Sequence, residues 1–185
     1  MKKIFAILLS ALFCCIFISC GDDEWGNGIP EMEHVYYVGF DWGGKDNWNN
    51  NRVEYDITKG GTMEIPVEFY SERVRSYDVV VFYYVSNAAG DLVRGVDYQI
   101  TDESGNVLEP DAKGAFSITF PQAKKGIKNV FVKSLATGQT GSFTMFTFDP
   151  NAGEIAYPDN ITNSQTADYE VRSFTRNYRV KVNVK

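Results

Sequence analysis

The sequence predicts an all-β domain built as a sandwich or barrel. Apolar and polar residues alternate over several short segments, a period of two that is typical of half-buried strands. Turn-forming groups such as Gly60-Gly61 and Ser104-Gly105-Asn106 separate these segments. No segment keeps a helical period over about three turns. Many short strands at this spacing indicate two packed sheets or a closed barrel.

Three segments show the alternation most clearly. In residues 62–69, Met, Ile, Val and Phe alternate with polar residues and with Pro66. Proline has no N–H to donate to a neighbouring strand, so Pro66 predicts that this strand lies at a sheet edge. Residues 116–120 alternate Phe and Ile with Ser and Thr, and residues 178–184 alternate Tyr and Val with charged or amide residues.

A more apolar segment, residues 77–85, is expected in the middle of a sheet because both of its faces are apolar. The abundance of aromatic residues, 13 Phe and 11 Tyr, suits pleated and half-buried surfaces. The remaining strand candidates are residues 35–40, 52–57, 98–101, 127–133 and 143–148. Together these segments predict one β-sandwich domain over residues 34–185.

Residues 1–19 have the layout of a secretory signal peptide. Lys2 and Lys3 come first, and a run dominated by Ile, Phe, Ala and Leu follows as far as Phe17. That run is shorter than the roughly 20 residues that a membrane-spanning helix needs. It leads into an acidic stretch, whereas a retained bacterial helix would more often be followed by Lys or Arg.

The residues before Cys20 resemble a lipobox, the sequence read by lipoprotein signal peptidase. Ile18, Ser19 and Cys20 match that motif, while Phe17 departs from the usual Leu. The match predicts cleavage before Cys20 and lipid on that cysteine, where several acyl chains hold a protein better than one. An ordinary signal peptide followed by an incidental cysteine is the alternative.

An acidic stretch follows the predicted anchor directly, formed by Asp22, Asp23 and Glu24. It resembles the export signal with which Bacteroides-like bacteria send lipoproteins to the outer face of the outer membrane; a solvated acidic linker is the alternative. Residues 20–33 as a whole are polar and Gly-rich, which predicts a flexible tether. We therefore expect an outer-membrane protein that is lipid-anchored and faces the cell exterior.

Size, charge and cysteine content bound what the mature chain can do. Removal of 19 of the 185 residues leaves 166, enough for one domain with a sizeable core. Without Lys2 and Lys3 the 18 basic residues become 16, against 24 acidic residues, so nucleic acid is not an expected partner. The cysteines are Cys14, Cys15 and Cys20, which leaves no mature thiol for a disulfide, a metal site or a nucleophile.

A resemblance to a known family rests on the order of five segments. They are 61–67 (Gly-Thr-Met-Glu-Ile-Pro-Val), 79–84 (Val-Val-Val-Phe-Tyr-Tyr), Gly95-Val96-Asp97-Tyr98, 116–121 (Phe-Ser-Ile-Thr-Phe-Pro) and 126–132 (Gly-Ile-Lys-Asn-Val-Phe-Val). This order resembles a Calx-beta-type domain over roughly residues 55–135, with 178–184 as a closing strand. The resemblance implies an immunoglobulin-like antiparallel β-sandwich used for adhesion or binding, similar to Calx-beta-like domains of surface lipoproteins in Bacteroides-like bacteria.

Some members of that family bind calcium through loop carboxylates, and Asp97 matches the aspartate of the family's turn. The calcium-binding members carry an acidic run after the strand that corresponds to residues 127–133. This chain has Ser-Leu-Ala-Thr-Gly at residues 134–138. One carboxylate cannot supply the about six to eight oxygens that calcium takes, so we expect neither a metal nor another cofactor.

The sequence offers few catalytic groupings. His34 is the one histidine, no His–His or His–Cys ligand spacing accompanies it, and we expect it to face solvent or to lie at a strand edge. No Gly-x-Ser-x-Gly motif is present. Two carboxylates could in principle hydrolyse a glycoside, but Asp102-Glu103 and the pair Glu109 and Asp111 lie in turn-like segments. We therefore expect a protein that is not an enzyme.

Residues 41–51 form the segment most suited to ligand binding. Trp42 and Trp48 lie there among amides that include Asn47 and Asn49. A sugar ring offers an apolar face on which a Trp ring can stack and hydroxyls that Asn can hydrogen-bond. The alternative is that Trp42 caps the core and the asparagines form a polar turn.

These observations favour a non-catalytic, surface-anchored binding or adhesion module. The predicted partners are the membrane, through the lipid anchor, and either a glycan or other outer-membrane proteins. The rival hypothesis is a structural accessory or spacer subunit of an outer-membrane assembly that has no small ligand.

Overall fold

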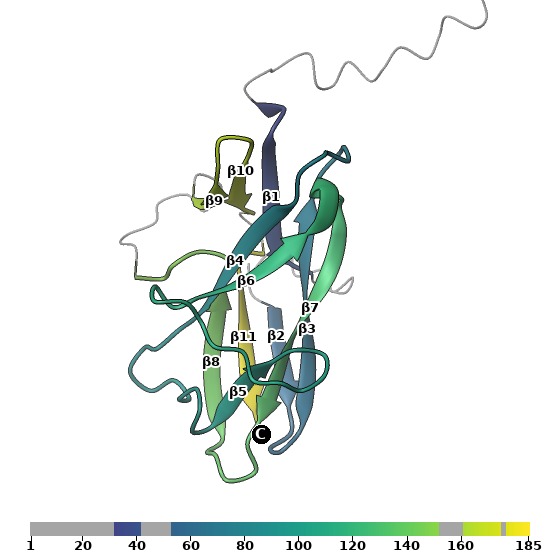
Figure 1. Cartoon of the computed structure of the whole chain (residues 1–185). Helices are drawn as coiled ribbons and strands as arrows, with labels where there is room; N and C mark the ends of the chain where they lie inside the picture. Colours follow the sequence, from purple (N-terminus) through teal and green to yellow (C-terminus); the bar gives the residue numbers. More distant parts are fainter. Residues whose placement is uncertain (1–31, 42–52, 152–160, 175–176) are drawn as a thin grey trace, which may run out of the picture. The chain divides into compact units, whose positions relative to one another are not determined.

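Two β-sheets packed face to face make up the unit of residues 35–185 (Figure 1). The computed structural model describes residues 32–41, 53–151, 161–174 and 177–185. Residues 1–34 form a separate unit. Apart from short turns and the 3-10 helix η3 (Pro121–Ala123), the regular structure of the described residues is strand, so the predicted all-β sandwich is confirmed.

The two sheets interleave strands from the whole length of the unit. Sheet A has six strands in the order β5-β7-β3-β1-β10-β9, and sheet B has five in the order β2-β11-β8-β4-β6. The strands of sheet A are β1 (Val35–Phe40), β3 (Thr62–Tyr70), β5 (Tyr98–Thr101), β7 (Gly126–Ser134), β9 (Thr162–Gln165) and β10 (Glu170–Ser173). The strands of sheet B are β2 (Val53–Ile57), β4 (Val79–Val85), β6 (Ala115–Phe120), β8 (Gly141–Phe146) and β11 (Arg179–Val184).

Both sheets are mixed rather than purely antiparallel. Among the pairings of the described strands, β1 with β10 and β11 with β2 are parallel, and the others are antiparallel. Each parallel pair joins a strand from the start of the unit to one from its end. Parallel strands need a long connection between them. Here eight other strands lie between the two members of each pair in the sequence.

The predicted alternation builds the core. The buried side chains of β3 and β11 are the apolar members of their alternating segments: Ile65, Val67, Phe69, Val180, Val182 and Val184. Between the sheets the ring of Tyr98 stacks on Phe143, with centroids 3.8 Å apart, and Phe69 stacks on Phe120 at 4.9 Å. Burial of each such side chain contributes about 1.5–3 kcal/mol.

Pro66 lies in an interior strand, so the edge prediction is wrong. β3 pairs with β7 on one side and with β1 on the other. The Pro66 carbonyl faces the end of β1 and accepts the N–H of Asp41 at 2.8 Å. The Asp41 carbonyl, which an N–H at position 66 would have met, accepts the Tyr55 hydroxyl instead, at 2.9 Å. Proline is tolerated inside this sheet because the strand beside it has ended.

β4 is an interior strand, as predicted, but its two edges are bonded in different ways. It pairs with β6 from Val79 to Tyr84, whereas β8 reaches only Tyr84 and Val85. Beyond β8, side chains of the β9–β10 hairpin take over. The Asn163 side chain accepts the N–H of Phe82 (2.8 Å) and donates to its carbonyl (2.6 Å). The hydroxyls of Ser164 and Tyr169 bond the backbone of Val80.

The sequence analysis did not predict β9 and β10. Their sequences, Thr-Asn-Ser-Gln and Glu-Val-Arg-Ser, lack an apolar alternation that would mark a strand. Asn163 and Ser164 are nevertheless buried. Their polar groups can be buried because the backbone of β4 satisfies them, a pairing that connects residues about 80 positions apart.

Candidate binding surface

The residues predicted for anchoring, export and ligand binding lie outside the described part of the chain and stay predictions. They are Cys20, Asp22, Asp23, Glu24, Trp42, Asn47, Trp48 and Asn49. The two ends of the tryptophan-containing segment are described. Asp41 follows β1 in sheet A and Val53 opens β2 in sheet B, so this segment connects the two sheets.

Three aromatic rings form a cluster on the outer face of sheet A, which we call the aromatic platform: Tyr37, Tyr70 and Phe174. Tyr37 and Tyr70 are register partners on β1 and β3, on the side of each strand that points away from the core. The Phe174 ring lies 5.2 Å from that of Tyr70 and 6.0 Å from that of Tyr37. All three side chains are partly exposed, so solvent reaches an aromatic surface.

Charged groups lie on both sides of the aromatic platform. On the β3 side, Lys125 approaches Glu68 to 4.0 Å and its Nζ lies 5.9 Å from the centre of the Tyr70 ring. On the β10 side, Arg172 donates two hydrogen bonds to the carboxylate of Glu170, at 2.9 and 3.2 Å. The platform therefore combines ring faces with charged donors and acceptors.

Asn177 fixes one edge of the platform, and Gly39 makes room for it. The Asn177 side chain donates to the Phe40 carbonyl (2.8 Å) and to the Tyr70 hydroxyl (3.3 Å). A Cβ on Gly39 would lie 2.0 Å from the Asn177 side-chain oxygen, so only glycine fits there. An isolated glycine inside a strand was the one sequence signal of this close approach.

Asp41, the residue at which the tryptophan-containing segment begins, lies near Tyr55 and Tyr70. Burial, followed by the charge of Asp41, raises the pKa of Tyr55. Burial and hydrogen bonding to Glu68 raise the pKa of Tyr70, and Asp41 contributes a smaller part. Two tyrosines from different sheets thus lie near the residue at which this segment begins, and both stay protonated at neutral pH.

Asp97, which matches the aspartate of the Calx-beta-type turn, has a structural role here. Its two carboxylate oxygens accept the N–H groups of Val93 and Gln139, each at 2.8 Å. These two hydrogen bonds lower the pKa of Asp97. A Cβ on Gly138 would lie 2.6 Å from the Asp97 Cα, so glycine is required where the two loops meet. The carboxylate joins two loops and has both oxygens occupied.

The other carboxylates considered for catalysis serve turns and surface pairs. Asp102 accepts the backbone and side-chain N–H groups of Asn106, both at 2.8 Å. Asp111 accepts the N–H of Ala115 at 2.9 Å, and Glu109 pairs with Arg94 at 2.6 Å. These contacts agree with the turn-like setting expected from the sequence.

Residues 32–41, 53–151, 161–174 and 177–185 hold no group of three or more His, Cys, Asp or Glu side chains that could bind a metal ion. The same residues contain no helix that is long and apolar enough to cross a membrane. His34 is exposed, as expected.

Comparison with known proteins adds little to this description. No family model matches the chain, and no curated protein matches it. CaCohA2 from Clostridium acetobutylicum is 13% identical, with a TM-score of 0.39, over 82% of this chain and 92% of that one. A cohesin of R. flavefaciens, solved with a dockerin, is 12% identical, with a TM-score of 0.35, over 80% of this chain and 95% of that one. Similarities this low assign the chain neither a family nor a function.

Proposed function

We propose that this protein is a non-catalytic binding module whose ligand is a glycan held on the aromatic platform. The observation that carries the proposal is the group of three partly exposed rings between two pairs of charged side chains. A pyranose ring presents an apolar face that can stack on Tyr37, Tyr70 or Phe174. Its hydroxyls can bond the carboxylates and cationic groups at the margins of the platform.

The tryptophan-containing segment would extend the same surface. It begins at Asp41, close to Tyr70, and the sequence puts Trp48 among asparagines. We expect Trp48 to contribute a further stacking ring and Trp42 to pack on the protein. Lipid on Cys20 and the acidic residues after it would hold the module at the outer face of the outer membrane.

The experiment compares rings on the two outer faces of the sandwich. A glycan array with purified wild-type protein identifies a ligand, and titration then gives its affinity for each variant. Phe174→Ala and Tyr37→Ala are expected to weaken binding about tenfold, as loss of a stacked ring does. Tyr84→Ala removes a partly exposed tyrosine from the outer face of sheet B and should leave the affinity unchanged.

Two further variants separate binding from folding and from anchoring. Trp48→Ala should lose affinity with little change in melting temperature, whereas Trp42→Ala should cost about 3–5 kcal/mol of stability. Cys20→Ser should remove glycan binding from intact cells, while the purified variant still binds. If no glycan binds the wild type, or if Tyr84→Ala weakens binding as much as Phe174→Ala, the spacer hypothesis replaces this one.

A further inference from the structure

The outer edge of β6 presents backbone groups that are available to another strand. Val80 and Phe82 bond the β9–β10 hairpin, so their backbone groups point away from β6. Their register partners on β6 are Thr119 and Ser117. In an antiparallel ladder such partners form non-hydrogen-bonded pairs, so the N–H and carbonyl groups of Ser117 and Thr119 point outward. No described residue bonds these four groups.

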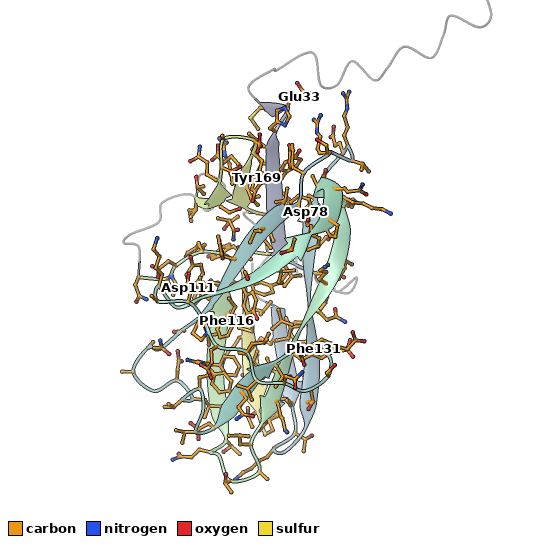
Figure 2. The ribbon with its side chains drawn as sticks, in the orientation of Figure 1. Glu33, Asp78, Asp111, Phe116, Phe131 and Tyr169 are labelled. Carbon is orange, nitrogen blue, oxygen red and sulfur yellow. The ribbon has the colours of Figure 1, made fainter. Side chains whose placement is uncertain are left out.

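Both ends of this edge are closed, and Figure 2 labels an aspartate near each end of β6, Asp111 before the strand and Asp78 beside its last residue. Before the strand, Asp111 accepts the N–H of Ala115 and donates its own N–H to the Ala115 carbonyl at 2.8 Å. After the strand, the next outward position is Pro121, which has no N–H and whose carbonyl accepts the N–H of Lys124 at 3.0 Å. The open stretch is therefore short and well defined, because the groups at each end already have partners.

The chain around β6 is basic within an acidic protein. Residues 111–128 contain four lysines and one acid, Asp111, whereas the whole chain has a formal net charge of −6. Among the described residues, Lys113, Lys124 and Lys128 form no ion pair. The Nζ of Lys128 lies 5.8 Å from the ring of Phe120, at the end of the strand. A peptide that runs along this edge thus passes several unpaired cations.

A comparison with β5, one of the two edge strands of sheet A, shows that an open edge is not general among the described strands. The segment after β5 turns back and covers it, with Leu108 N–H donating to the Ile100 carbonyl and Asp102 N–H to the Asn106 carbonyl, both at 2.9 Å. A second copy of the chain is a poor partner for β6. Pairing two β6 edges would bring the same lysines together, and lysine at an edge is a common device against such pairing.

We propose that the outer edge of β6 binds an extended acidic segment of a partner protein as an added antiparallel strand. Main-chain bonds to Ser117 and Thr119 supply the pairing, as in other complexes formed by strand addition. Acidic side chains of the partner pair with Lys113, Lys124 and Lys128 and set the preference for its charge. The strand that would add here pairs with sheet B, whereas the aromatic platform lies on the outer face of sheet A.

The test uses purified protein and a ten-residue synthetic peptide, about one strand long, in which Glu alternates with Val and Thr. Binding should protect the amides of Ser117 and Thr119 from hydrogen exchange. Thr119→Pro removes an outward N–H and should weaken binding at least about tenfold, while Thr119→Ala keeps it. Both variants should retain the wild-type melting temperature within a few degrees, because the N–H at position 119 serves no bond within the fold.

A charge variant tests the proposal independently of any proline effect. Lys124→Glu with Lys128→Glu keeps the edge open, so the acidic peptide should bind about tenfold more weakly. A peptide with Lys in place of Glu should then bind better than it does to the wild type. The proposal is overturned if Thr119→Pro binds with unchanged affinity, if protection appears elsewhere, or if the protein dimerises through β6. Loss of glycan binding by Phe174→Ala bears only on the aromatic platform.

Discussion

The ladder formed by β4 and β6 has two outer edges, and the outward backbone groups of these two edges differ in their hydrogen bonding. On the β4 edge, the backbone groups of Val80 and Phe82 are bonded by side chains of Asn163, Ser164 and Tyr169. Directly across the ladder, the outward groups of Thr119 and Ser117 have no bond from the described residues. The two positions are register partners in the same sheet and differ in what lies beside them.

This difference shows that a sheet edge can be closed without another strand. The Asn163 amide has a carbonyl acceptor and two N–H donors, and the acceptor together with one donor reproduces what a neighbouring peptide group would present. It bonds both backbone groups of Phe82 and also the Thr147 carbonyl, at 2.7 Å. Closure of the β4 edge in this way leaves β6 as the edge of sheet B at which another strand can add to this ladder.

The largest expected loss of stability comes from removing the Asn163 side chain, which closes the β4 edge. Asn163→Ala leaves the N–H and carbonyl of Phe82 without partners, which should cost about 2–4 kcal/mol. For a domain of this size the melting temperature should fall by roughly 5–15 °C. Asn129→Ala is the matched control, since the Asn129 side chain is exposed and bonds the exposed side chain of Glu64, and it should change stability by less than about 0.5 kcal/mol. If both variants lose the same free energy of unfolding, the hydrogen bonds of Asn163 contribute no more to stability than those of an exposed asparagine.

The next largest expected effect is the stability cost of proline, which should differ between the two edges of β6. Ile118 and Val81 are register partners whose backbone groups face each other, whereas Thr119 faces outward. Ile118→Pro should therefore be less stable than Ile118→Ala by about 2 kcal/mol or more, through loss of a ladder bond. Thr119→Pro should differ from Thr119→Ala by less than about 1 kcal/mol. Urea denaturation of the four variants checks this, and similar differences at both positions would contradict the assigned register.

The smallest effect concerns the covered edge of β5 and depends on pH. Hydrogen bonds from the side chain and backbone of Asn106 hold the pKa of Asp102 below its usual value of 3.8. A carboxyl whose pKa is lower in the folded state stabilises that state above its unfolded pKa. The contribution is lost as pH falls through the folded pKa, below 3.8. The turn that holds residues 106–108 against β5 should therefore loosen in acid.

Hydrogen exchange measures this loosening directly. From about pH 5 to about pH 2, protection of the Leu108 amide should fall relative to that of Val81 in the β4–β6 ladder. In Asp102→Asn the Leu108 amide should be less protected throughout, with little dependence on pH. If Leu108 and Val81 lose protection in parallel, Asp102 does not control the cover of β5.

Most strands follow from the sequence because alternation is a local property. In β3, β6 and β11 the period of two requires only that neighbouring side chains point to opposite faces. It therefore predicted the core residues Val67, Phe120 and Val182 without knowledge of their partners, and all three are buried. Residues 77–85 were predicted to be interior because both of their faces are apolar, and β4 has strands or side chains on both edges.

The sequence did not predict which strands and backbone groups would pair with each other. Pro66 predicted an edge, because proline lacks an N–H, yet β3 is interior and the missing donor faces the place where β1 ends. Asn163 and Ser164 were not predicted in a strand, because a polar segment becomes a buried strand only when a distant backbone satisfies it. Neither outcome is encoded within a few residues of the position concerned.

The candidate surfaces divide in the same way. The sequence by itself determined the fold class, the core faces of the main strands, the predicted anchor at Cys20 and the basic segment around β6, since each depends on residues close together in the chain. Only the tertiary structure brought Tyr37, Tyr70 and Phe174 onto one face, from β1, β3 and the end of β10. It also decided which edge stays open, because strand order arises from contacts between segments that are far apart in sequence, and local patterns carry no information about them.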